Sequence, residues 1–495
     1  MPNALNTIYV TLVVLISVYG LHALIITTLY LLRRRRVYPR MEPLWKTDAQ
    51  WPMVAVQLPL YNEQDAAGRV IDRVCALEYP RERLIIQILD DSTDGTTELA
   101  RQRVEHYRAL GCRVELLHRT DRTGYKAGAL SEALASNGAE FIAIFDADFL
   151  PAPDYLLRII PRFADDPHIG MVQARWGHHN RDTNLITRVQ ALFHDGHHVV
   201  EQVARSRSNL FLNFNGTGGV WRAAAIRDCG GWQWDTLAED VDISYRAQML
   251  GWKLVFLPEI IVPGEVPVTL TLFKKQQYRW TFGHIQVFRK LIGRVLTAPG
   301  VSLPQRLSGF LHLSTNFAQI AGLLTFLLSV PMAFLRLDQP SSLGLISLAS
   351  AGPSVMFAVS QVFGYREGPR RTLARLLHVP LLVLLAVGLT ISNSAAVFAV
   401  FSGKKLVWNV TPKAAANGKH NGAHGNGTVP LMVWLEIAMS FYCAVGLSLA
   451  LRGAPELIPL TTLGMLSYGF VGFSGMVESN RPKKAREVKV EMAHK

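Results

Sequence analysis

Two pairs of aspartates follow short apolar runs in the first third of the chain. Asp90 and Asp91 end the run LIIQILDD, and Asp146 and Asp148 end FIAIFDAD. One acidic pair at such a position is often only turn or helix-capping chemistry. Two pairs at equivalent strand ends offer hard oxygen ligands for Mg²⁺ or Mn²⁺, and such an ion can hold a diphosphate. The pattern therefore predicts a metal and phosphate site.

Three more charged residues fit the same chemistry. Lys126 opens a helical segment in GYKAGAL, where an ammonium group and a helix N-terminus both favour phosphate. Glu239 and Asp240 open another helix, EDVDISYRAQML, where acidic residues are as often simple partners of the helix dipole. The functional alternative makes Asp240 a general base that takes the proton of an acceptor hydroxyl in an inverting sugar transfer. A hydrolase would need a carboxylate pair flanking the bond, which no local pattern indicates.

The segment KKQQYRW at 274–280 places three useful side chains on one helical face. Gln276, Arg279 and Trp280 stand at positions i, i+3 and i+4. A guanidinium can grip phosphate oxygens in a fork, and an indole offers an apolar platform for a sugar ring. An amphipathic helix at the membrane surface would have a similar sequence, and one segment can serve both purposes.

Apolar runs separated by helix-period segments must position these residues. The runs lie at 54–60, 84–90, 113–118, 141–146 and 169–174. Their alternation with helical patterns predicts an α/β domain with a parallel sheet that binds ligands at the carboxyl ends of its strands. No GxGxxG or GxxxxGK[ST] segment follows a strand, which excludes a glycine-loop phosphate cradle.

The remaining sequence indicates a membrane protein. Of 495 residues only 18% are charged, against roughly 25% in an average soluble domain. Six apolar runs are long enough to span a bilayer. Five carry no charged residue, and the run at 430–451 is interrupted only by Glu436. The runs lie at 1–32, 307–335, 339–364, 376–403, 430–451 and 457–477.

Basic clusters predict the orientation of these runs. Arg33 to Arg36 end the first run and should be cytoplasmic, which puts the N-terminus outside and residues 37–306 inside. The basic loop at 366–371 and the basic tail after 480 should also lie inside. Five crossings satisfy all clusters if 376–403 enters the membrane or its interface and returns. The first run lacks the features of a cleaved signal peptide.

A net charge of +13 does not favour nucleic acid here, because the basic residues lie largely beside apolar runs. Four scattered cysteines predict neither a zinc module nor a disulfide framework. The histidines of HDGHHVVEQ (His194, His197, His198) fit polar lining near an acceptor cleft better than a zinc site.

One helix over 307–335 would place His312, Asn316 and Gln319 on a single face. These polar groups would either line a path for a growing glycan or hydrogen-bond neighbouring helices.

Four motifs in chain order resemble a known family. Asp90-Asp91, Asp146-Ala147-Asp148, Ala238-Glu239-Asp240 and Gln276-Gln277-Tyr278-Arg279-Trp280 are similar to the DD, DxD, TED and QxxRW motifs of membrane-embedded glycosyltransferase family 2. The likeness is to cellulose synthase and the cellulose-synthase-like mannan, glucomannan or glucan synthases, over roughly residues 50–413. Ala238 stands where the family usually has threonine. The resemblance implies an α/β GT-A (Rossmann-like) cytoplasmic catalytic domain plus an α-helical transmembrane bundle.

The resemblance also implies roles for individual residues. Asp240 would be the catalytic base with Glu239 beside it, and Asp146 and Asp148 would hold Mg²⁺ or Mn²⁺. A segment at 408–413 is similar to the FxVTxK gating loop, with Trp408, Thr411 and Lys413 at its marked positions. The acceptor would meet Trp280 and Asn215. The donor would meet Tyr61, Glu63, Asp90, Asp91, Lys126, Asp146, Gln276 and Arg279.

The organisation expected on this basis has seven parts. They are an N-terminal transmembrane helix with its basic stop at 1–36, the GT-A domain at 37–270, interfacial helices at 271–300, transmembrane and interface helices at 301–403, the gating loop and a linker at 404–429, two transmembrane helices at 430–477, and a basic cytoplasmic tail at 478–495.

The favoured function is a processive, inverting glycosyltransferase of the plasma or inner membrane. It would polymerise a β-linked polysaccharide from UDP-glucose or GDP-mannose and export the growing glycan through the lipid bilayer. A single-transfer enzyme acting on a lipid acceptor is the alternative. A transporter with a nucleotide-binding domain would not need three acidic motifs and Trp280.

Overall fold

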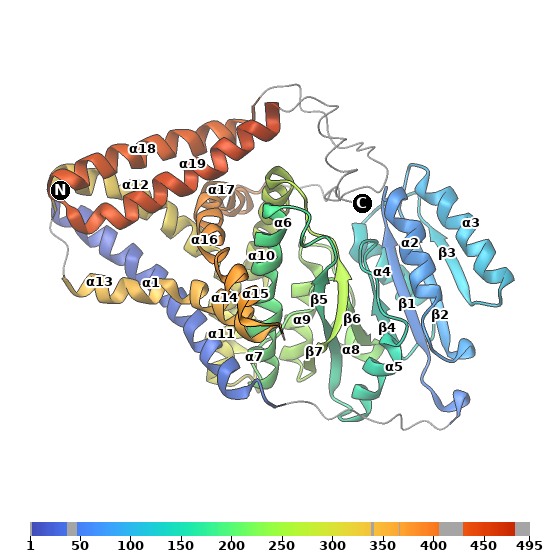
Figure 1. The fold of residues 1–495 in the computed structure, drawn as a ribbon. Helices are drawn as coiled ribbons and strands as arrows, with labels where there is room; N and C mark the ends of the chain where they lie inside the picture. The colour runs from blue at the N-terminus through green and yellow to red at the C-terminus, as the bar shows by residue number, and fades with distance from the viewer. Residues whose placement is uncertain (1, 37–46, 338–340, 366, 405–428, 481–495) are drawn as a thin grey trace.

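A computed structural model describes residues 2–36, 47–337, 341–365, 367–404 and 429–480 of the chain. Figure 1 shows a sheet with its covering helices on one side of the molecule and the long apolar helices on the other. Helix α10 (Leu270–Thr297), which carries the QQYRW segment, lies between the two regions. The expected segments 408–413 and 481–495 lie outside the described residues.

The sheet has seven strands in the order β3-β2-β1-β4-β6-β5-β7. Every neighbouring pair is parallel except the two pairs made by β6, which runs antiparallel between β4 and β5. The strands are β1 (Val54–Leu60), β2 (Leu84–Asp90), β3 (Val114–His118), β4 (Phe141–Ile144), β5 (Ile169–His178), β6 (Gly219–Arg222) and β7 (Lys253–Gly264).

All five apolar runs expected to form strands are confirmed, but the expectation of a purely parallel sheet is wrong. Strands β6 and β7 were not expected from the sequence. Strand β6 is only four residues long, and β7 contains Pro258 and Pro263. Proline argues against a central strand, but β7 lies at the edge of the sheet, where a missing N–H is tolerated.

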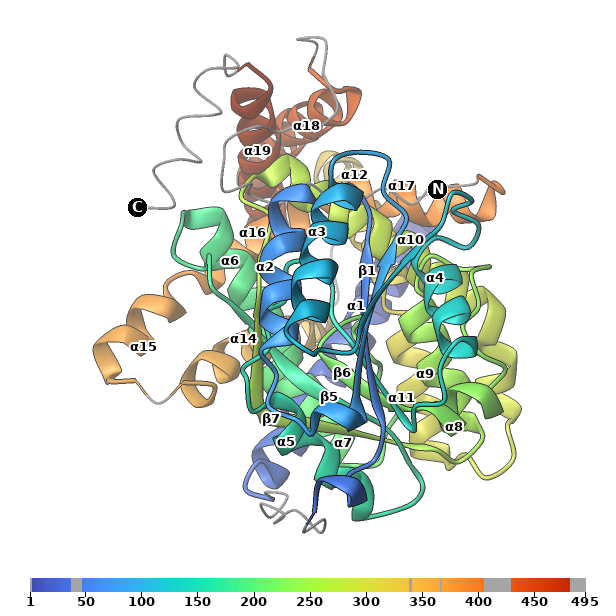
Figure 2. The ribbon, with the colours of Figure 1, turned by 90° about the vertical axis from the view of Figure 1, so that its right-hand side faces the viewer.

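Helices cover both faces of the sheet (Figure 2). One face packs against α2 (Gln64–Cys75), α3 (Thr96–Ala109) and α5 (Tyr155–Ile159), and the other against α4 (Tyr125–Ala135), α8 (Ala223–Asp228) and α9 (Glu239–Met249). Alternate residues of β1 serve the two layers: Val54, Val56 and Leu58 face the first, and Ala55 faces the second. Burial on both faces explains why the strands are almost continuously apolar.

Six helices in the described part of the chain have the length and composition of membrane spans. Which of them cross, and in which direction, stays a prediction. The six cover Asn3–Arg33, Phe317–Leu335, Leu343–Phe363, Pro369–Gly388, Leu431–Gly453 and Pro455–Asn480. Their elements are α1 (Pro2–Arg33), α12 (Phe317–Leu335), α13 (Ser341–Leu348), α14 (Gly352–Phe363), α15 (Pro369–Leu376), α16 (Val379–Gly388), α18 (Leu431–Gly453) and α19 (Ile458–Asn480).

The single helix expected over 307–335 is wrong. Helix α11 (Leu303–Leu313) ends before Ser314, and α12 begins after Asn316. Three polar residues, Ser314, Thr315 and Asn316, lie between the two helices, and serine and asparagine favour helix ends over helix interiors.

The polar stripe is divided as well. His312 Nδ1 lies 2.7 Å from the Tyr245 hydroxyl of α9, and Thr281 Oγ1 of α10 donates to Asn316 Oδ1 at 3.3 Å. Hydrogen bonding to neighbouring helices therefore accounts for His312 and Asn316.

The run expected at 376–403 is also divided. Helix α16 ends at Gly388 and α17 (Thr390–Phe401) begins two residues later, with a turn at Leu389. Helix α17 packs along α10 rather than extending α16.

Two contacts fix α10 against the apolar helices. Glu478 of α19 accepts the backbone N–H groups of Leu270 (2.8 Å) and Thr271 (2.9 Å), which are otherwise unpaired at a helix N-terminus. Lys274 forms a buried ion pair with Glu436 of α18. The helix that presents Gln276, Arg279 and Trp280 to the sheet is therefore held in place by the last two apolar helices.

Candidate active site

The carboxyl end of β4 places Asp146 at the centre of a polar cluster. Lys126 Nζ lies 2.5 Å from Asp146 Oδ1 and 2.9 Å from the carbonyl oxygen of Gly216. Thr217 Oγ1 accepts the backbone N–H of Asp146 at 2.9 Å. Two left-handed residues, Gly124 (φ +75°) and Tyr125 (φ +50°), turn the chain at the start of α4 so that Lys126 reaches this point.

The first turn of α9 brings a second acidic pair to the cluster. Asp240 Oδ1 accepts the N–H of Val241 at 2.9 Å. Gly216 lies between the two groups: a Cβ on it would be 3.3 Å from Asp240 Oδ2 and 3.7 Å from Lys126 Nζ. The absent side chain and the left-handed backbone (φ +81°) at Gly216 allow the base candidate and the ammonium group to approach the same point.

The charges in this cluster oppose one another. Burial and the neighbouring charge of Glu239 raise the pKa of Asp240 to about 7. Burial disfavours the ammonium form of Lys126, but the charges of Asp146 and Glu239 outweigh it and raise the pKa of Lys126. The site therefore holds a fixed cation beside a carboxylate poised near neutral pH, which suits proton transfer at a diphosphate leaving group.

The raised pKa of Asp240 predicts that the rate of sugar transfer depends on pH. Asp240 can accept a proton only when ionised, so we expect the second-order rate constant for transfer to fall about tenfold per pH unit below about pH 7. Glu239→Gln removes one cause of the raised pKa and should move this limb to lower pH. Initial rates from about pH 5 to about pH 9 would check both statements. A limb that stays in place in Glu239→Gln would contradict the assignment.

Helix α10 adds a cation and an aromatic ring. Burial lowers the pKa of Arg279, and the charges of Glu239, Asp146, Glu63 and Asp240 act in the opposite direction. Arg279 therefore lies near enough to the acidic cluster for its charges to act on the guanidinium. The Trp280 ring lies edge-on to His194, with centroids 5.7 Å apart. Gln276 is buried, and its side-chain oxygen has no hydrogen-bond partner within the described ranges.

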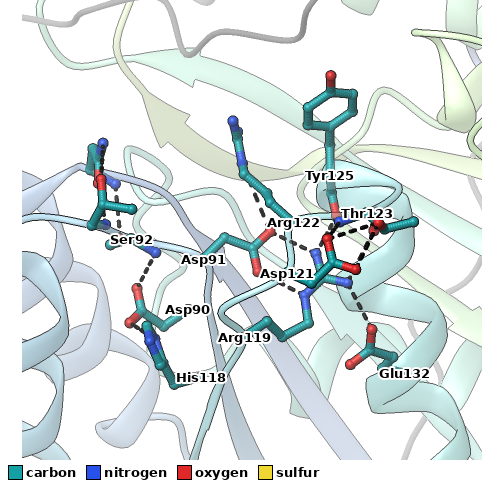
Figure 3. A network of polar contacts seen from close by, with 12 residues as sticks. Asp90, Asp91, Ser92, His118, Arg119, Asp121, Arg122, Thr123, Tyr125 and Glu132 are labelled. Carbon is teal, nitrogen blue, oxygen red and sulfur yellow. Dashed lines mark hydrogen bonds and ion pairs between the residues drawn. The ribbon is translucent and has the colours of Figure 1, made fainter.

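A second cluster lies at the ends of β2 and β3 (Figure 3). Asp91 is held in a fork by Arg119, with Nε to Oδ1 at 2.8 Å and Nη2 to Oδ2 at 2.7 Å. The Arg122 guanidinium lies 3.2 Å from the ring centroid of Tyr61. A guanidinium stacked on an aromatic ring, beside a carboxylate held in a fork, offers groups that suit a nucleoside.

Asp90 has a different environment from Asp91. Its carboxylate is fully buried and accepts from Thr97 Oγ1 (2.6 Å), His118 Nδ1 (2.8 Å) and the backbone N–H of Ser92 (3.1 Å). The structure therefore uses Asp90 to shape the loop that presents Asp91, and direct donor contact by Asp90 stays an untested prediction.

Arg119 and Arg122 were not among the site residues expected from the sequence. Their signal was present in HRTDRTGYK, where two arginines directly follow a strand end. Glu63 immediately precedes α2, at the same edge of the sheet. The gating-loop residues Trp408, Thr411 and Lys413 lie outside the described residues.

Asp146 and Asp148 fit a divalent cation in part. They supply hard carboxylate oxygens from one strand end, as Mg²⁺ and Mn²⁺ prefer. In the described ranges no group of three His, Cys, Asp or Glu side chains is arranged to hold a metal. The pair therefore suits an ion that takes its other ligands from a diphosphate and water.

Comparison with known proteins agrees with this geometry. Residues 52–283 match the family described as "Glycosyltransferase like family 2". Residues 52–283 form a family 2 glycosyltransferase domain. The resemblance drawn from the four motifs is thereby confirmed. Strands β1 to β7 all lie within the glycosyltransferase domain, and so do Asp146, Asp240 and Arg279.

The chain is similar over about half its length to plant proteins named as glucomannan mannosyltransferases. It is 42% identical over 273 residues to "Probable glucomannan 4-beta-mannosyltransferase 7" of Oryza sativa subsp. japonica, which is 53% of this chain and 47% of that protein. It is 41% identical over 252 residues to "Glucomannan 4-beta-mannosyltransferase 2" of Arabidopsis thaliana, covering 50% and 47%. The chain thus spans about half the length of these relatives.

One solved structure shares the fold of the glycosyltransferase domain. The mannosyltransferase PcManGT from Pyrobaculum calidifontis, in complex with GDP-Man and Mn²⁺, superposes with a TM-score of 0.53 at 23% identity, covering 80% of this chain and 99% of that one. The expected GT-A fold is thereby confirmed.

Proposed function

We propose that this protein is an inverting, processive glycosyltransferase that polymerises a β-1,4-linked polysaccharide of mannan or glucomannan type. The proposal rests on the approach of Lys126 and Asp240 to Gly216, with Asp146 bound to Lys126. This arrangement puts a base and a cation at one point. GDP-mannose is the proposed donor, on the basis of about 40% identity to glucomannan 4-beta-mannosyltransferases. UDP-glucose is the second donor that the same site would take.

In this reaction Asp240 takes the proton of an acceptor hydroxyl as the oxygen attacks the anomeric carbon. The bond from that carbon to the diphosphate breaks on the opposite face, so the configuration inverts. Lys126 and Arg279 stabilise the negative charge that develops on the leaving diphosphate. Trp280 orients the acceptor sugar through its apolar face.

Asp146 and Asp148 would hold Mg²⁺ or Mn²⁺, which supplies charge neutralisation at the diphosphate. Arg122 and Tyr61 would face the nucleoside, beside the Asp91 and Arg119 pair. The apolar helices would carry the product through the cell membrane, with the glycosyltransferase domain in the cytoplasm. Trp408, Thr411 and Lys413 keep their proposed role as a loop that closes over the nucleotide.

Incubation of the purified full-length protein with radiolabelled GDP-mannose or UDP-glucose tests the proposal. We expect a product of high molecular mass that an endo-β-1,4-mannanase degrades. Label that extracts into organic solvent would instead indicate a single transfer to lipid. No incorporation from either donor, with Mg²⁺ or Mn²⁺ present, would contradict the proposed function.

A further inference from the structure

A buried ion pair lies behind the loop that contains Gly216. Arg205 of α7 (Gln202–Arg207) is completely buried, and its guanidinium contacts Glu201 Oε1 at 2.8–2.9 Å. Arg205 also donates to Ser308 Oγ of α11 at 3.1 Å. The other carboxylate oxygen, Glu201 Oε2, lies 2.9 Å from His197 Nδ1. Arg205 therefore fixes the Glu201 carboxylate, and this carboxylate in turn holds the imidazole of His197.

The backbone that carries this group is unusual. Gly196–Glu201 form one π-helical turn between α6 (Leu185–Asp195) and α7. Gly196 lies against Phe357 of α14, where a Cβ would come within 2.4 Å of a ring carbon. Single π turns inside helices occur frequently at functional sites, where they redirect a side chain. Here the turn brings His197 to the loop at 213–218.

The second ring nitrogen of His197 meets Asn215. Nε2 lies 3.0 Å from Asn215 Oδ1. The same Nε2 lies 3.1 Å from Gln202 Nε2, so one edge of the imidazole meets the Glu201 carboxylate and the other meets two side-chain amides. No function assigned so far uses His197, Glu201 or Arg205.

These contacts fix the orientation of the Asn215 amide. Gln202 Nε2 donates to the carbonyl oxygen of Asn213 at 3.0 Å, which identifies that atom as the nitrogen. The same Gln202 nitrogen lies 3.1 Å from Asn215 Oδ1. The Asn215 oxygen thus faces the network and its nitrogen faces away. Asn215 Nδ2 is buried and has no hydrogen-bond partner among the residues that the structure describes.

Asn215 directly precedes the glycine at which Lys126 and Asp240 approach each other. The next residue, Gly216, accepts from Lys126 and faces Asp240. A buried donor without a partner destabilises the protein, so a ligand group that accepts from it recovers that cost. A sugar hydroxyl is the group that accepts from an amide and also gives its proton to a carboxylate.

We propose that His197, held by Glu201, is a positioning residue that directs Asn215 Nδ2 toward the hydroxyl-bearing sugar that receives the transferred residue. This role rests on the proposed function. It makes Asn215 the group that touches the acceptor, while His197 acts only through Asn215.

A double-mutant cycle tests the role with the full-length protein, GDP-mannose and a short β-1,4-mannooligosaccharide. We expect His197→Ala and Asn215→Ala each to lower kcat/KM for the oligosaccharide about tenfold, the size of one hydrogen bond. The double variant should be no worse than Asn215→Ala alone, because the two residues act in series. Binding of GDP-mannose should stay within about twofold of wild type in all variants.

Two variants serve as references. His197→Gln keeps a donor toward Asn215 and should retain more activity than His197→Ala. His106→Ala, on the exposed face of α3, should match wild type. Losses that multiply in the double variant would overturn the proposal, and so would a parallel loss of GDP-mannose binding, which indicates a damaged fold. A wild-type protein that transfers no sugar would overturn the proposed function and this role with it.

Discussion

Asp240→Asn is expected to lower the rate of sugar transfer by roughly 10²-fold or more, with donor binding nearly unchanged. The substitution keeps the size and the hydrogen bond from the N–H of Val241 but removes the proton acceptor. Its effect should therefore fall on kcat rather than on the apparent affinity for the sugar nucleotide. Initial rates and nucleotide titration on the same preparation would separate the two quantities.

Two comparisons make this test specific. Asp235→Asn changes an exposed carboxylate that pairs with Lys290 and lies shortly before α9 in the chain. This variant should keep a rate close to wild type. Glu239→Gln should cost less than Asp240→Asn, because Glu239 influences the reaction through the pKa of Asp240. Near-normal turnover in Asp240→Asn would remove this residue from the mechanism. Equal losses in both variants would mean that the two carboxylates act as one unit.

Much of the candidate site was predictable because it depends on strand ends. Asp91 and Asp146 each follow a run of apolar residues, and parallel strands bring such ends to one edge of the sheet. The helical spacing of Gln276, Arg279 and Trp280 is equally local. What these patterns could not indicate is distance: nothing in the sequence places Lys126 within 2.5 Å of Asp146 or brings Gly216 between Lys126 and Asp240.

The expectations that failed depended on contacts between distant segments. Arg119 stands 28 residues after Asp91, and only the pairing of β2 with β3 brings the two together. The interruption at Ser314 is stabilised by partners on other helices, such as Thr281 with Asn316. Strand β6 is too short to be recognised without the neighbours that it joins. Local propensity is a weak guide in each case, because tertiary packing decides the outcome.

The contacts of His197 could not be predicted from the sequence either. In the sequence, HDGHHVVEQ is a cluster of histidines that suggests either a metal site or polar lining. The structure separates them: His194 lies against Trp280, His197 contacts Glu201 and Asn215, and His198 packs on Trp176. A π-helical turn causes this separation, and no residue pattern predicts such a turn.

Removal of divalent cations is expected to abolish sugar transfer. EDTA should reduce incorporation to background, and added Mg²⁺ or Mn²⁺ should restore it, if Asp146 and Asp148 hold an ion against the diphosphate. Asp148→Asn should then show little activity at any metal concentration. Lys126→Met should weaken donor binding but keep the requirement for metal, because Lys126 adds charge and supplies no ligand.

Sugar transfer that continues in EDTA would also be informative, because of the ion pair between Lys126 and Asp146. At 2.5 Å the ammonium group already neutralises the Asp146 carboxylate, which would face the diphosphate in the proposed reaction. A site that uses Lys126 and Arg279 as its only cations would work in EDTA, and Lys126→Met would then abolish transfer. A metal-dependent site should instead retain part of its activity in Lys126→Met at high Mn²⁺, because the ion and the ammonium group stabilise the same leaving group. Incorporation measured for wild type and Lys126→Met, with and without chelator, therefore decides which cation carries the charge.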